Sequence, residues 1–594
     1  MSMENLNVTI LYGSETGTAQ DTAEQIWKNA KRYGLKCCIN AMDDYQIQNI
    51  VCERLIIFVV ATTGQGECPM NMRRFWRFLL QKNLPINLLE NLKYSVLGLG
   101  DSSYEKFNYA AKRLHKRIAQ LGGTELLPIG LANDQDDLGI DTVIGPWSKE
   151  LWNVISHEFN IALAHSTTNT DEIIERFHVN ILDKKLINDN NEKHYSIYHE
   201  ELNVNDTLRE GRVIENIRTT AEDHFQDVRL IKFHIENINY KPGDLLYVRP
   251  RNSPKQIQNF FDLLKEHDIP LYPETIISIT EKEIKLPLAL KQPVTLKQIV
   301  EQYWDLNYKP RKLTMLALSS ISDSEIEKEK LIEFSTAEGQ EELYTYVNRP
   351  RRNIVEVLRD FPHTTKNLNI KILFEIMVPI KPRAFSIASS NLDTPNEIHL
   401  LVAVVKYKTN LIEPRLGLCS NWLASLRTDE KIICWIQKGT FKFDYDKPMI
   451  LIGPGTGIAA FRSMLLDRAA MKQSLNDTIL FFGCRYKNKD YHCQNDFEML
   501  NRVNNLRIFC AFSRDQDDKI YVQHIIHEQR ELCWQLLNKG GKVYLSGSSK
   551  NMPKSVREEF VILAKDVGKF NEVEAENFIR TLEKTQRYQT ETWS

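Results

Sequence analysis

The stretch Val8-Thr-Ile-Leu-Tyr-Gly-Ser-Glu-Thr-Gly-Thr-Ala19 decides the fold of the first part of the chain. Its apolar residues indicate a strand, and its glycines and hydroxyl residues form a loop that runs into a helical pattern from Gln20 to Arg32. A strand that passes through a short polar loop into a helix is the repeating unit of a doubly wound parallel sheet. The loop would then lie at the carboxyl end of its strand, where such sheets bind ligands.

Two more strands of this kind follow. The apolar run Leu55 to Ala61 ends in Thr62-Thr63-Gly64-Gln65-Gly66, and the run Tyr94 to Leu99 ends in Gly100-Asp101-Ser102-Ser103-Tyr104. All three loops are expected at one edge of the sheet, where helix N-termini favour an anion such as phosphate and Tyr104 could stack on a planar ring. The first loop alone fits an N-cap with a tight turn equally well, but the three together favour a bound nucleotide. Asp134, past a fourth strand, could cap the same site or be a solvated loop acid.

Length and composition exclude several classes of protein. At about 100 to 200 residues per domain, the 594 residues should form several folding units. Hydrophobic residues make up 42% and charged residues 26%, as in ordinary globular proteins. The 76 Lys and Arg against 78 Asp and Glu give a net charge of −2, so no global basic field exists to hold nucleic acid or an anionic membrane.

The sequence shows no sign of a membrane protein or a metalloprotein. Its apolar runs are far shorter than the roughly 18 to 20 residues that cross a bilayer, and Met1 to Asn7 does not look like a secretion signal. The 10 scattered cysteines lack metal-ligand spacing and read as reduced thiols. We therefore expect a cytoplasmic protein without a membrane anchor, a disulfide framework or a metal site.

The pattern of strands and helices predicts three parts. The first α/β domain is expected over residues 1–161, followed by a polar linker over 162–200. Short strands joined by turns indicate an antiparallel barrel over 201–445, interrupted by a charged helical insertion at about 255–365. Alternating strands and helices return over 446–594. The predicted fold class is a multidomain α/β protein with a β-barrel in its middle.

The last part carries a second candidate phosphate site. The loop Gly453-Pro-Gly-Thr-Gly457 follows a strand and opens a helix, but it lacks the third glycine of the usual dinucleotide fingerprint. Ser513, Arg514, Lys519 and Tyr521 combine two cations with two hydroxyls, which suits a dianionic phosphate better than a ribose diol. A solvated turn with neighbouring aspartates is the alternative interpretation.

The barrel carries a third candidate site. Arg383-Ala384-Phe385-Ser386 lies on a predicted strand, and Gly417-Leu418-Cys419-Ser420 begins a helix. An arginine can clamp a pyrophosphate, a phenylalanine can pack on a flavin or adenine ring, and a glycine-led helix start can receive a phosphate. Taken alone, the strand would be a structural edge, Cys484 a buried thiol and Trp593 a packed or frayed terminus.

Over nearly its whole length the chain resembles the diflavin reductase family. The motifs that carry the resemblance are Gly13-Ser-Glu-Thr-Gly-Thr-Ala19, Ala61-Thr-Thr-Gly-Gln-Gly66, Leu97-Gly-Leu-Gly-Asp-Ser-Ser-Tyr-Glu-Lys-Phe-Asn108, Arg383-Ala-Phe-Ser-Ile-Ala-Ser-Ser390, Gly453-Pro-Gly-Thr-Gly457, Phe482-Gly-Cys-Arg485, Phe512-Ser-Arg514 with Lys519-Ile-Tyr-Val-Gln523, and Glu591-Thr-Trp-Ser594. The resemblance implies a flavodoxin-like FMN-binding domain, an FAD-binding antiparallel barrel with a helical insertion, and a ferredoxin-reductase-like NADPH-binding domain that ends in a flavin-shielding tryptophan.

The resemblance also assigns residues to each cofactor. FMN is expected at Ser14, Glu15, Thr16, Gly17, Thr18, Ala19, Ala61, Thr62, Thr63, Gly64, Leu99, Gly100, Asp101, Ser102, Ser103, Tyr104, Glu105, Lys106, Phe107, Asn108 and Asp134. FAD is expected at Arg351 or another arginine of Arg349-Pro-Arg-Arg352, and at Arg383, Ala384, Phe385, Ser386, Gly417, Leu418, Cys419, Ser420 and Trp593. NADPH is expected at Thr456, Ser513, Arg514, Lys519, Ile520, Tyr521, Val522 and Gln523.

Four residues are expected at the hydride-transfer site by the same resemblance. Ser386, Cys484 and Glu591 match residues that position the nicotinamide against FAD by orientation and electrostatics, with no covalent step. Trp593 would cover the flavin face. The implied route runs from NADPH to FAD, to FMN and to a protein acceptor. Because NADPH delivers two electrons as hydride and an iron–sulfur or haem acceptor takes one, a flavin has to stand between them.

Within the family, the chain is most similar to the branch that passes electrons to an anamorsin-type iron–sulfur protein in cytosolic iron–sulfur cluster assembly. The flavodoxin-like part begins almost at Met1, and Thr63 stands where cytochrome P450 reductases carry an FMN-stacking tyrosine. Three departures are mild: Glu15 replaces a usual glutamine, Ala460 a usual proline, and Glu591 an aspartate of P450 reductases.

Two other functions are compatible with the sequence. A P450- or sulfite-type reductase would perform the same chemistry with a haem acceptor. A catalytically idle flavoprotein scaffold is an alternative of another class, and the intact phosphate, flavin and hydride-site residues argue against it. We expect a monomer or a transient heterocomplex.

Overall fold

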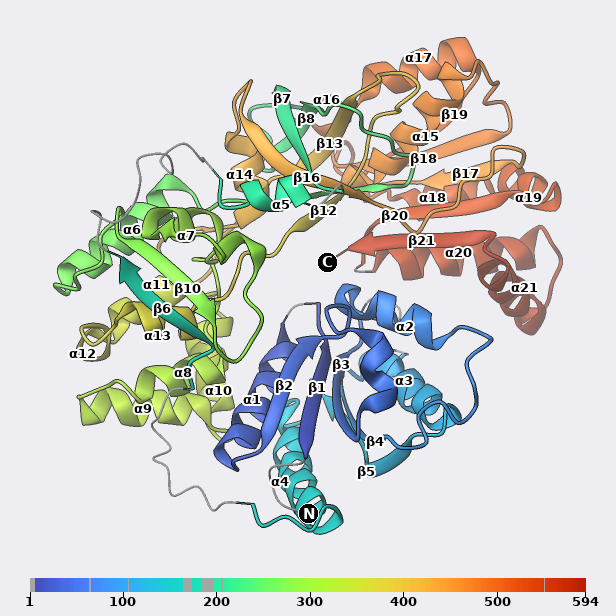
Figure 1. Ribbon diagram of the computed structural model, residues 1–594. Helices are drawn as coiled ribbons and strands as arrows, with labels where there is room; N and C mark the ends of the chain where they lie inside the picture. Colours follow the sequence, from blue (N-terminus) through green and yellow to red (C-terminus); the bar gives the residue numbers. More distant parts are fainter. Residues whose placement is uncertain are drawn as a thin grey trace. The chain divides into compact units, whose positions relative to one another are not determined.

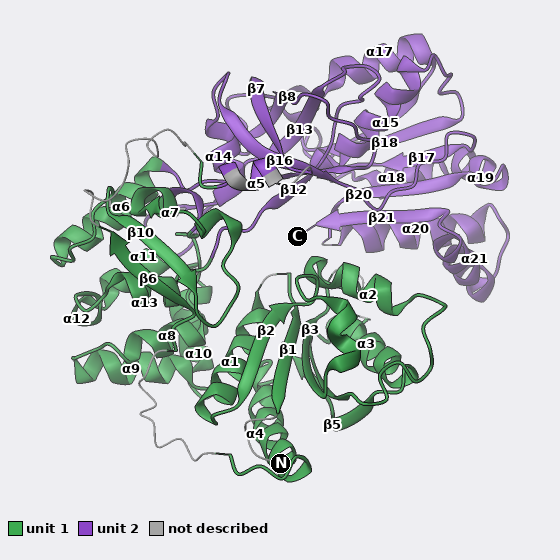
Figure 2. Ribbon diagram, viewed as in Figure 1, with its two compact units in different colours: residues 1–197, 254–300, 304–378 green, residues 198–253, 301–303, 379–594 purple. Residues whose placement is uncertain are grey.

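The computed structural model describes residues 6–15, 17–63, 66–104, 106–163, 174–182, 196–204, 207–549 and 551–593. Of the residues predicted to bind FMN, Thr16, Gly64 and Glu105 lie outside these ranges. The chain forms two compact units (Figure 2). Unit 1 comprises residues 1–197, 254–300 and 304–378, and unit 2 comprises residues 198–253, 301–303 and 379–594.

A parallel sheet forms the centre of the first part of unit 1 (Figure 1). Its strands are β1 (Asn7–Gly13), β2 (Lys36–Ala41), β3 (Leu55–Ala61), β4 (Lys93–Gly100) and β5 (Thr124–Asn133), in the order β2-β1-β3-β4-β5. Strand β3 is central and buried over nearly its whole length, which explains its uninterrupted apolar sequence.

Helices cover both faces of this sheet. Leu55, Ile57 and Val59 pack in a core with α1 (Thr18–Arg32) and α4 (Asp141–Glu158). The alternate residues of β3 pack in a second core with α2 (Arg73–Leu79) and α3 (Tyr109–Gln120). Because successive side chains of a strand point to opposite faces, one apolar strand supplies both cores. The doubly wound parallel sheet predicted from the sequence is confirmed. Two 3-10 segments, η2 (Ile47–Cys52) and η3 (Met70–Met72), lie in its connections.

Unit 1 also contains the helical insertion and a small antiparallel sheet. Strands β6 (Phe177–Leu182), β10 (Ile276–Glu281) and β11 (Val294–Thr295) pair in the order β11-β10-β6. The range 162–200, predicted as a linker, thus contains strand β6, which is too short to stand out within a polar stretch of sequence. The helices of the insertion are α6 (Pro254–Glu266), η6 (Leu288–Leu290), α7 (Leu296–Gln302), α8 (Lys312–Ser319), α9 (Glu325–Ser335), α10 (Gln340–Leu343), the π-helix η7 (Tyr344–Asn348), α11 (Ile354–Asp360), α12 (Pro362–Thr365) and α13 (Ile370–Ile376).

Ion pairs join the insertion to the flavodoxin-like part within unit 1. Lys31 of α1 lies 2.6 Å from Glu283, and Lys312 of α8 pairs with Asp141 of α4. Each pair links residues more than a hundred positions apart in the sequence. The insertion therefore packs with the flavodoxin-like part, although the chain enters it from the barrel.

Unit 2 begins with the predicted antiparallel barrel. Its strands are β7 (Arg209–Arg218), β8 (Val228–His234), β9 (Leu245–Val248), β12 (Arg383–Ser386), β13 (Glu397–Ala403) and β16 (Lys431–Gln437), in the order β12-β9-β16-β7-β8-β13. A bridge between Ile387 and Leu400 joins the two outer strands, so the sheet closes on itself. The remaining elements are α5 (His199–Val204), β14 (Lys406–Tyr407), β15 (Arg415–Leu416) and α14 (Leu418–Ser425).

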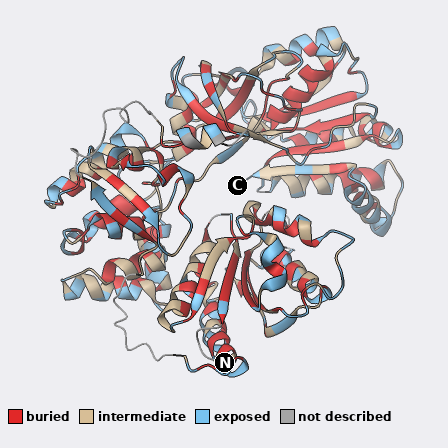
Figure 3. Ribbon diagram, in the orientation of Figure 1, coloured by how far each residue is buried: buried red, intermediate tan, exposed pale blue. Residues whose placement is uncertain are grey.

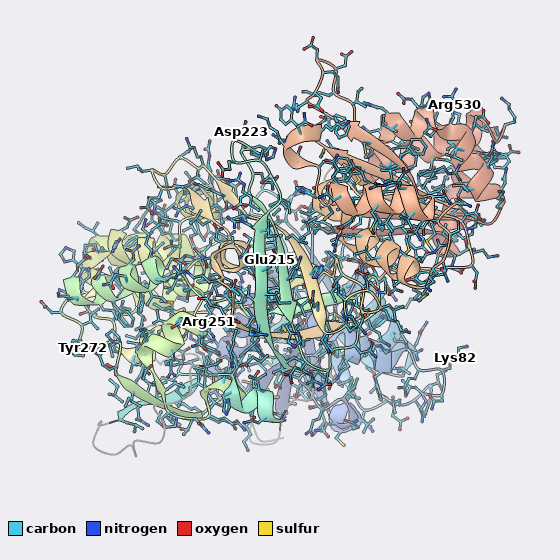
Figure 4. All side chains as sticks on the ribbon, turned by 90° about the horizontal axis from the view of Figure 1, so that it is seen from above. Lys82, Glu215, Asp223, Arg251, Tyr272 and Arg530 are labelled. Atoms are coloured by element: carbon cyan, nitrogen blue, oxygen red, sulfur yellow. The ribbon has the colours of Figure 1, made fainter. Side chains whose placement is uncertain are left out.

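The rest of unit 2 is a second parallel α/β layer. Strands β17 (Met449–Ile452), β18 (Thr478–Cys484), β19 (Arg507–Phe512), β20 (Lys542–Ser548) and β21 (Tyr588–Trp593) are ordered β19-β18-β17-β20-β21. The central strands are buried (Figure 3). The accompanying helices are η8 (Gly455–Ile458), α15 (Ala459–Ala470), α16 (Lys487–Asp490), α17 (Gln494–Asn504), α18 (Val522–Glu528), α19 (Arg530–Asn538), α20 (Met552–Asp566) and α21 (Glu572–Lys584). Across the described ranges, no helix has both the length and the apolarity needed to cross a bilayer.

Candidate functional site

The first loop of the flavodoxin-like part is folded around Ser14. The buried hydroxyl Oγ of Ser14 accepts the Gly17 N–H at 3.0 Å, and the Ser14 N–H donates to Oδ1 of Asn71 at 2.8 Å. Gly17 has φ +101° at the N-cap of α1, a conformation that favours glycine. Thr18 and Ala19 begin the helix, where the first N–H groups have no intrahelical acceptor. The loop is therefore built to receive an anion.

The second loop is tied to its neighbours through Thr62. The Thr62 N–H donates to the Leu99 carbonyl at 3.1 Å, and Thr62 Oγ1 accepts the Ala110 N–H at 3.2 Å. Thr63 pairs with Glu67 in a single bridge, with 3.0 Å between the Thr63 N–H nitrogen and the Glu67 carbonyl oxygen. Ala61, the last residue of β3, is half-buried. These bonds bring the ends of β3 and β4 together.

The third loop closes over the buried side chain of Asn108. A Cβ on Gly100 would lie 2.8 Å from Asn108 Oδ1, so only glycine fits there. Asn108 has φ 53° at the N-cap of α3, and its amide donates to the Ala132 carbonyl at 3.0 Å. Its Oδ1 has no hydrogen-bond donor among the residues that the structure describes. An orphaned acceptor at the edge of the sheet fits a ligand that brings a donor.

Side chains of the same loop remain open to a ligand. Tyr104 is 58% exposed, so its ring is available for stacking. The Ser102 N–H donates to Asn133 Oδ1 at 2.9 Å, and the Ser103 N–H donates to Asp101 Oδ1 at 2.8 Å. The Asp134 N–H donates to the Gly100 carbonyl at 2.9 Å, which places Asp134 beside Asp101. Partial burial and the neighbouring charge of Asp101 raise the pKa of Asp134.

Other residues predicted for FMN support the loops. The Glu15 carboxylate accepts the Met70 N–H at 2.9 Å, so this departure from the family pattern is used to hold the loop. Lys106 lies against Gly66, whose Cβ would be 2.6 Å from Lys106 Cδ. The Lys112 ammonium lies 5.1 Å from the centre of the Phe107 ring.

In unit 2, the barrel brings the predicted FAD residues together. Arg383, Ala384, Phe385 and Ser386 form strand β12, which pairs with β9. Because side chains alternate along a strand, Arg383 and Phe385 lie on one face of the sheet, and Ala384 and Ser386 lie on the other face. Gly417 is the N-cap residue of α14. A Cβ on Gly417 would lie 2.8 Å from Val405 Cβ, and the Ser420 hydroxyl accepts the Val405 N–H at 3.0 Å.

Arg383 is close to the start of α14. Burial raises the pKa of the Cys419 thiol to about 12, and the positive charge of Arg383 opposes that rise. Leu418 is the first residue of this helix. A guanidinium beside a helix N-terminus is a suitable setting for a pyrophosphate.

Arg351 belongs to unit 1 and stands in a left-handed turn at φ 59°. It is exposed, and its N–H donates to the Asn348 carbonyl at 3.3 Å. Arg352, by contrast, lies 3.0 Å from Asp360 and 4.3 Å from the Tyr346 ring centre. Arg349 is exposed as well, so exposure sets Arg352 apart but does not choose between Arg349 and Arg351. The assignment of Arg351 to FAD stays a prediction.

The glycine loop after β17 fits a nucleotide. Gly455 has φ 58° and open space where its Cβ would be, whereas a Cβ on Gly457 would lie 2.1 Å from the Ser546 carbonyl. The loop therefore needs glycine at both positions, once for its turn and once for a close backbone approach. Thr456 lies between them.

Arg514 and Lys519 lie in the loop after β19, and both are exposed to solvent. Neither side chain forms an ion pair with any residue in the described part of the chain. Asp515, next to Arg514, accepts the Lys487 N–H at 2.9 Å. Two free cations are expected where a phosphate binds. The neighbouring predicted residues are the buried Ser513 and Val522, half-buried Ile520 and Gln523, and exposed Tyr521.

Ser386 and Glu591 meet in unit 2. The Ser386 hydroxyl donates to Glu591 Oε1 at 3.4 Å, and Thr440 donates to Oε2 at 2.8 Å. Glu591 lies on β21 and Cys484 ends β18, so both are at the carboxyl edge of the same parallel sheet. Glutamate can therefore take the place of the aspartate of P450 reductases and still reach the serine.

The Cys484 loop is held by Asp490. The Asp490 carboxylate accepts the N–H groups of Arg485 at 2.9 Å and Tyr486 at 2.6 Å. Burial, followed by the charge of Asp490, raises the pKa of Cys484, so this thiol stays protonated at neutral pH. A neutral thiol is consistent with a positioning role without a covalent step.

Trp593 ends strand β21. Residue 593 pairs with Ser548, and its carbonyl accepts the Ser549 N–H at 2.8 Å. The side chain is 39% exposed and makes no ring contact with any described residue. The backbone therefore anchors the chain end, while the indole is left available to cover a flavin.

Sequence reasoning missed several residues that hold these loops: Asn71, Asn133, Thr440 and Asp490. Asn133 and Asp490 stand close to quoted motifs and could have been found by asking which side chain satisfies the loop N–H groups. Asn71 and Thr440 act across 57 and 151 positions, and nothing in the local sequence marks them.

Comparison with known proteins decides the family. The flavodoxin model matches residues 10–147, the FAD binding domain model residues 211–422, and the oxidoreductase NAD-binding domain model residues 451–558. Proteins named NADPH-dependent diflavin oxidoreductase 1 are similar over their full length: 44% identical in Xenopus laevis, 41% in Mus musculus and 34% in Arabidopsis thaliana, each with 100% of both chains covered. The chain belongs to the NADPH-dependent diflavin oxidoreductases. The predicted family, fold class and cofactors are confirmed.

Family membership gives the cofactors FMN, FAD and NADPH, which supply hydride and electron transfer when bound. The residues described above fit them. The Ser14 loop and α1 suit the FMN phosphate, Arg383 and α14 suit the FAD pyrophosphate, and Arg514 with Lys519 suits the NADPH phosphate. The contribution of the chain is to bind, orient and shield these groups.

A first prediction concerns Asp490. In Asp490→Asn, one of the two acceptor oxygens becomes an amide that cannot receive an N–H, so the Cys484 loop should loosen. Loss of a charge-assisted hydrogen bond of about 1.5 to 3 kcal/mol should slow reduction of FAD by NADPH about tenfold or more. Stopped-flow absorbance of the flavin measures this rate.

Thiol labelling supplies a second readout. Because the Asp490 charge raises the pKa of Cys484, its removal should lower that pKa and speed alkylation of Cys484, followed by mass spectrometry. Asp515→Asn is the matched control: it removes one carboxylate-to-backbone bond, to Lys487, in the same region. The charge of Asp515 also raises the pKa of Cys484, but less than that of Asp490, so labelling should change less in Asp515→Asn than in Asp490→Asn. Unchanged flavin reduction and unchanged labelling in Asp490→Asn would contradict the positioning role.

Proposed function

We propose that the acceptor of this diflavin oxidoreductase is an iron–sulfur protein of the anamorsin type, reduced in the cytoplasm during iron–sulfur cluster assembly. The resemblance of the motifs to that branch, with Thr63 in place of a stacking tyrosine, supports this choice. An iron–sulfur centre takes one electron at a time, which matches what a two-flavin chain delivers.

Exposed acidic residues beside the FMN loops support the proposal that the acceptor is a protein. Glu67 is 56% exposed at its side chain and pairs only loosely with Arg73, at 3.5 Å. Asp137 is exposed in the loop after β5, next to the half-buried Asp136. Such acids raise the rate at which a positively charged surface docks. Two further acids of this region are set aside: Asp141 pairs with Lys312, and Glu105 lies outside the described residues.

The experiment compares acceptors on one preparation. Flavin-replete protein with NADPH is mixed in turn with an anamorsin-type iron–sulfur protein, a cytochrome P450 and a sulfite reductase haemoprotein. Faster reduction of the iron–sulfur protein at equal concentration is expected. Preferred reduction of a haem acceptor would replace the proposal with a P450- or sulfite-type reductase, and a purified protein that holds no flavin would indicate a scaffold.

A second prediction tests the acidic surface. Asp137→Lys should lower the second-order rate of acceptor reduction about threefold to tenfold at low salt, because steering charge acts on association. The effect should vanish at high salt, where charges are screened. Glu150→Lys is the control, since it makes the same charge change at an exposed position of α4. An equal loss of rate in Asp137→Lys and Glu150→Lys, or a rate that does not depend on salt concentration, would contradict the docking role of the acidic surface.

A further inference from the structure

The guanidinium of Arg311 reaches the phosphate loop of the flavodoxin-like part. A Cβ built on Gly17 would lie 3.0 Å from both terminal nitrogens of Arg311. Arg311 comes from the helical insertion, as the N-cap residue of α8, and both segments belong to unit 1. A residue almost three hundred positions away therefore stands beside the turn that opens α1.

The loop itself supplies no cation. Residues 13 to 20 contain no lysine or arginine, and Glu15 adds a negative charge that is used on the Met70 N–H. Asp21, in the first turn of α1, lies 3.7 Å from Arg311, which is longer than a hydrogen bond. Burial raises the pKa of Asp21 to about 6, with the Arg311 charge acting against the rise. Arg311 thus only partly compensates this acid.

Arg311 also lies among other cations. The pKa of Lys309 is lowered by burial and then by the charges of Arg351 and Arg311. Cations held together in this way repel one another, so the cluster gains free energy from a nearby anion. A phosphate at the start of α1 would be such an anion, since it carries up to two negative charges.

We propose that Arg311 of the helical insertion binds the phosphate of FMN and so couples FMN occupancy to the docking of the flavodoxin-like part on the insertion. FMN then contacts both parts of unit 1. By thermodynamic linkage, whatever strengthens the docking also strengthens FMN binding, and the reverse. Arg311 acts as a binding residue and takes no part in electron transfer.

Comparison of two ligands isolates the phosphate contact. Full-length protein is freed of FMN, and its affinity for FMN and for riboflavin, which lacks the phosphate, is measured by flavin fluorescence. Arg311→Gln should weaken FMN about tenfold to hundredfold, the loss expected for a charge-assisted hydrogen bond, and leave riboflavin within about twofold. Lys312→Gln is the matched control: it removes an ion pair between the same two parts, to Asp141.

Two results would overturn the proposal. One is an equal loss for FMN and riboflavin in Arg311→Gln, which would indicate a general packing role. The other is an FMN affinity that Arg311→Gln leaves unchanged. Arg311→Lys keeps the charge and should recover part of the FMN affinity, and FAD content with circular dichroism verifies folding. If Arg311→Gln does not fold, Arg311→Lys carries the test: a selective loss for FMN supports the phosphate contact, and an equal or absent loss rejects it.

Hydrogen exchange tests the coupling directly. In the wild-type protein, FMN should slow exchange of the α8 amides, residues 312–319, whereas riboflavin should slow it less. In Arg311→Gln the two ligands should protect α8 equally. Identical protection of α8 by FMN and riboflavin in the wild-type protein would reject the coupling.

Discussion

Trp593→Ala is expected to raise kcat/KM for NADH about tenfold to hundredfold. If the indole covers the FAD ring, each incoming nicotinamide has to displace it, at a cost that includes about 0.5 to 1.5 kcal/mol of ring stacking and the buried area of a large aromatic side chain. The structure supports this reading, because the backbone of residue 593 is anchored in β21 while the side chain is 39% exposed. The indole is therefore free to act as a gate.

NADPH should gain less from the same change. Its additional phosphate can bind Arg514 and Lys519, and this binding energy offsets the cost of displacing the indole in the wild-type protein. NADH lacks that phosphate. The ratio of kcat/KM for NADPH to that for NADH should thus fall in Trp593→Ala, and release of NADP⁺ should slow because the nicotinamide stays longer on the flavin.

The measurement uses steady-state kinetics with both nucleotides on flavin-replete protein. Trp593→Phe is the control, since it keeps a smaller ring on the same strand and should give an intermediate ratio. If Trp593 serves only to anchor the chain end, the variant would lose stability or FAD and keep the wild-type ratio. That outcome would remove the gate.

The sequence predicts what depends on local pattern. Strand β3 is apolar at every position because both of its faces are buried, and this run, followed by a loop and a helix, was enough to predict a doubly wound sheet. Gly17 and Gly457 stand where only glycine fits, and such positions keep their place in a motif. The candidate binding residues at the strand ends could be predicted for the same reason, since they belong to local motifs.

Contacts between distant segments could not be predicted in this way. Strand β6 pairs with β10, about a hundred residues later in the sequence. The alternation of apolar and polar residues in β6 is too short to be recognised within a polar stretch. Arg311 reaches Gly17, and Thr440 reaches Glu591, only because separate elements pack together. A local sequence pattern predicts which face of a helix or strand is buried, but it does not predict which other element covers that face.

Arg514→Ala should lower kcat/KM for NADPH about tenfold to hundredfold and change that for NADH little, because a charge-assisted hydrogen bond to phosphate contributes about 1.5 to 3 kcal/mol. Arg514 is exposed and its side chain forms no ion pair with the described residues. Its replacement therefore removes a ligand contact without breaking a bond within the protein. The fold should stay intact.

Arg502→Ala is the matched control for Arg514→Ala, since Arg502 is also an exposed arginine of the same α/β layer, on α17. Removing a positive charge at either position alters the general attraction of the domain for an anionic nucleotide equally, and salt screens that part. Only a direct phosphate contact gives a loss that is confined to NADPH and that persists at high salt. Equal losses for NADH and NADPH in Arg514→Ala, or the same loss in Arg502→Ala, would move the phosphate contact away from Arg514 and leave Lys519 as the cation to test.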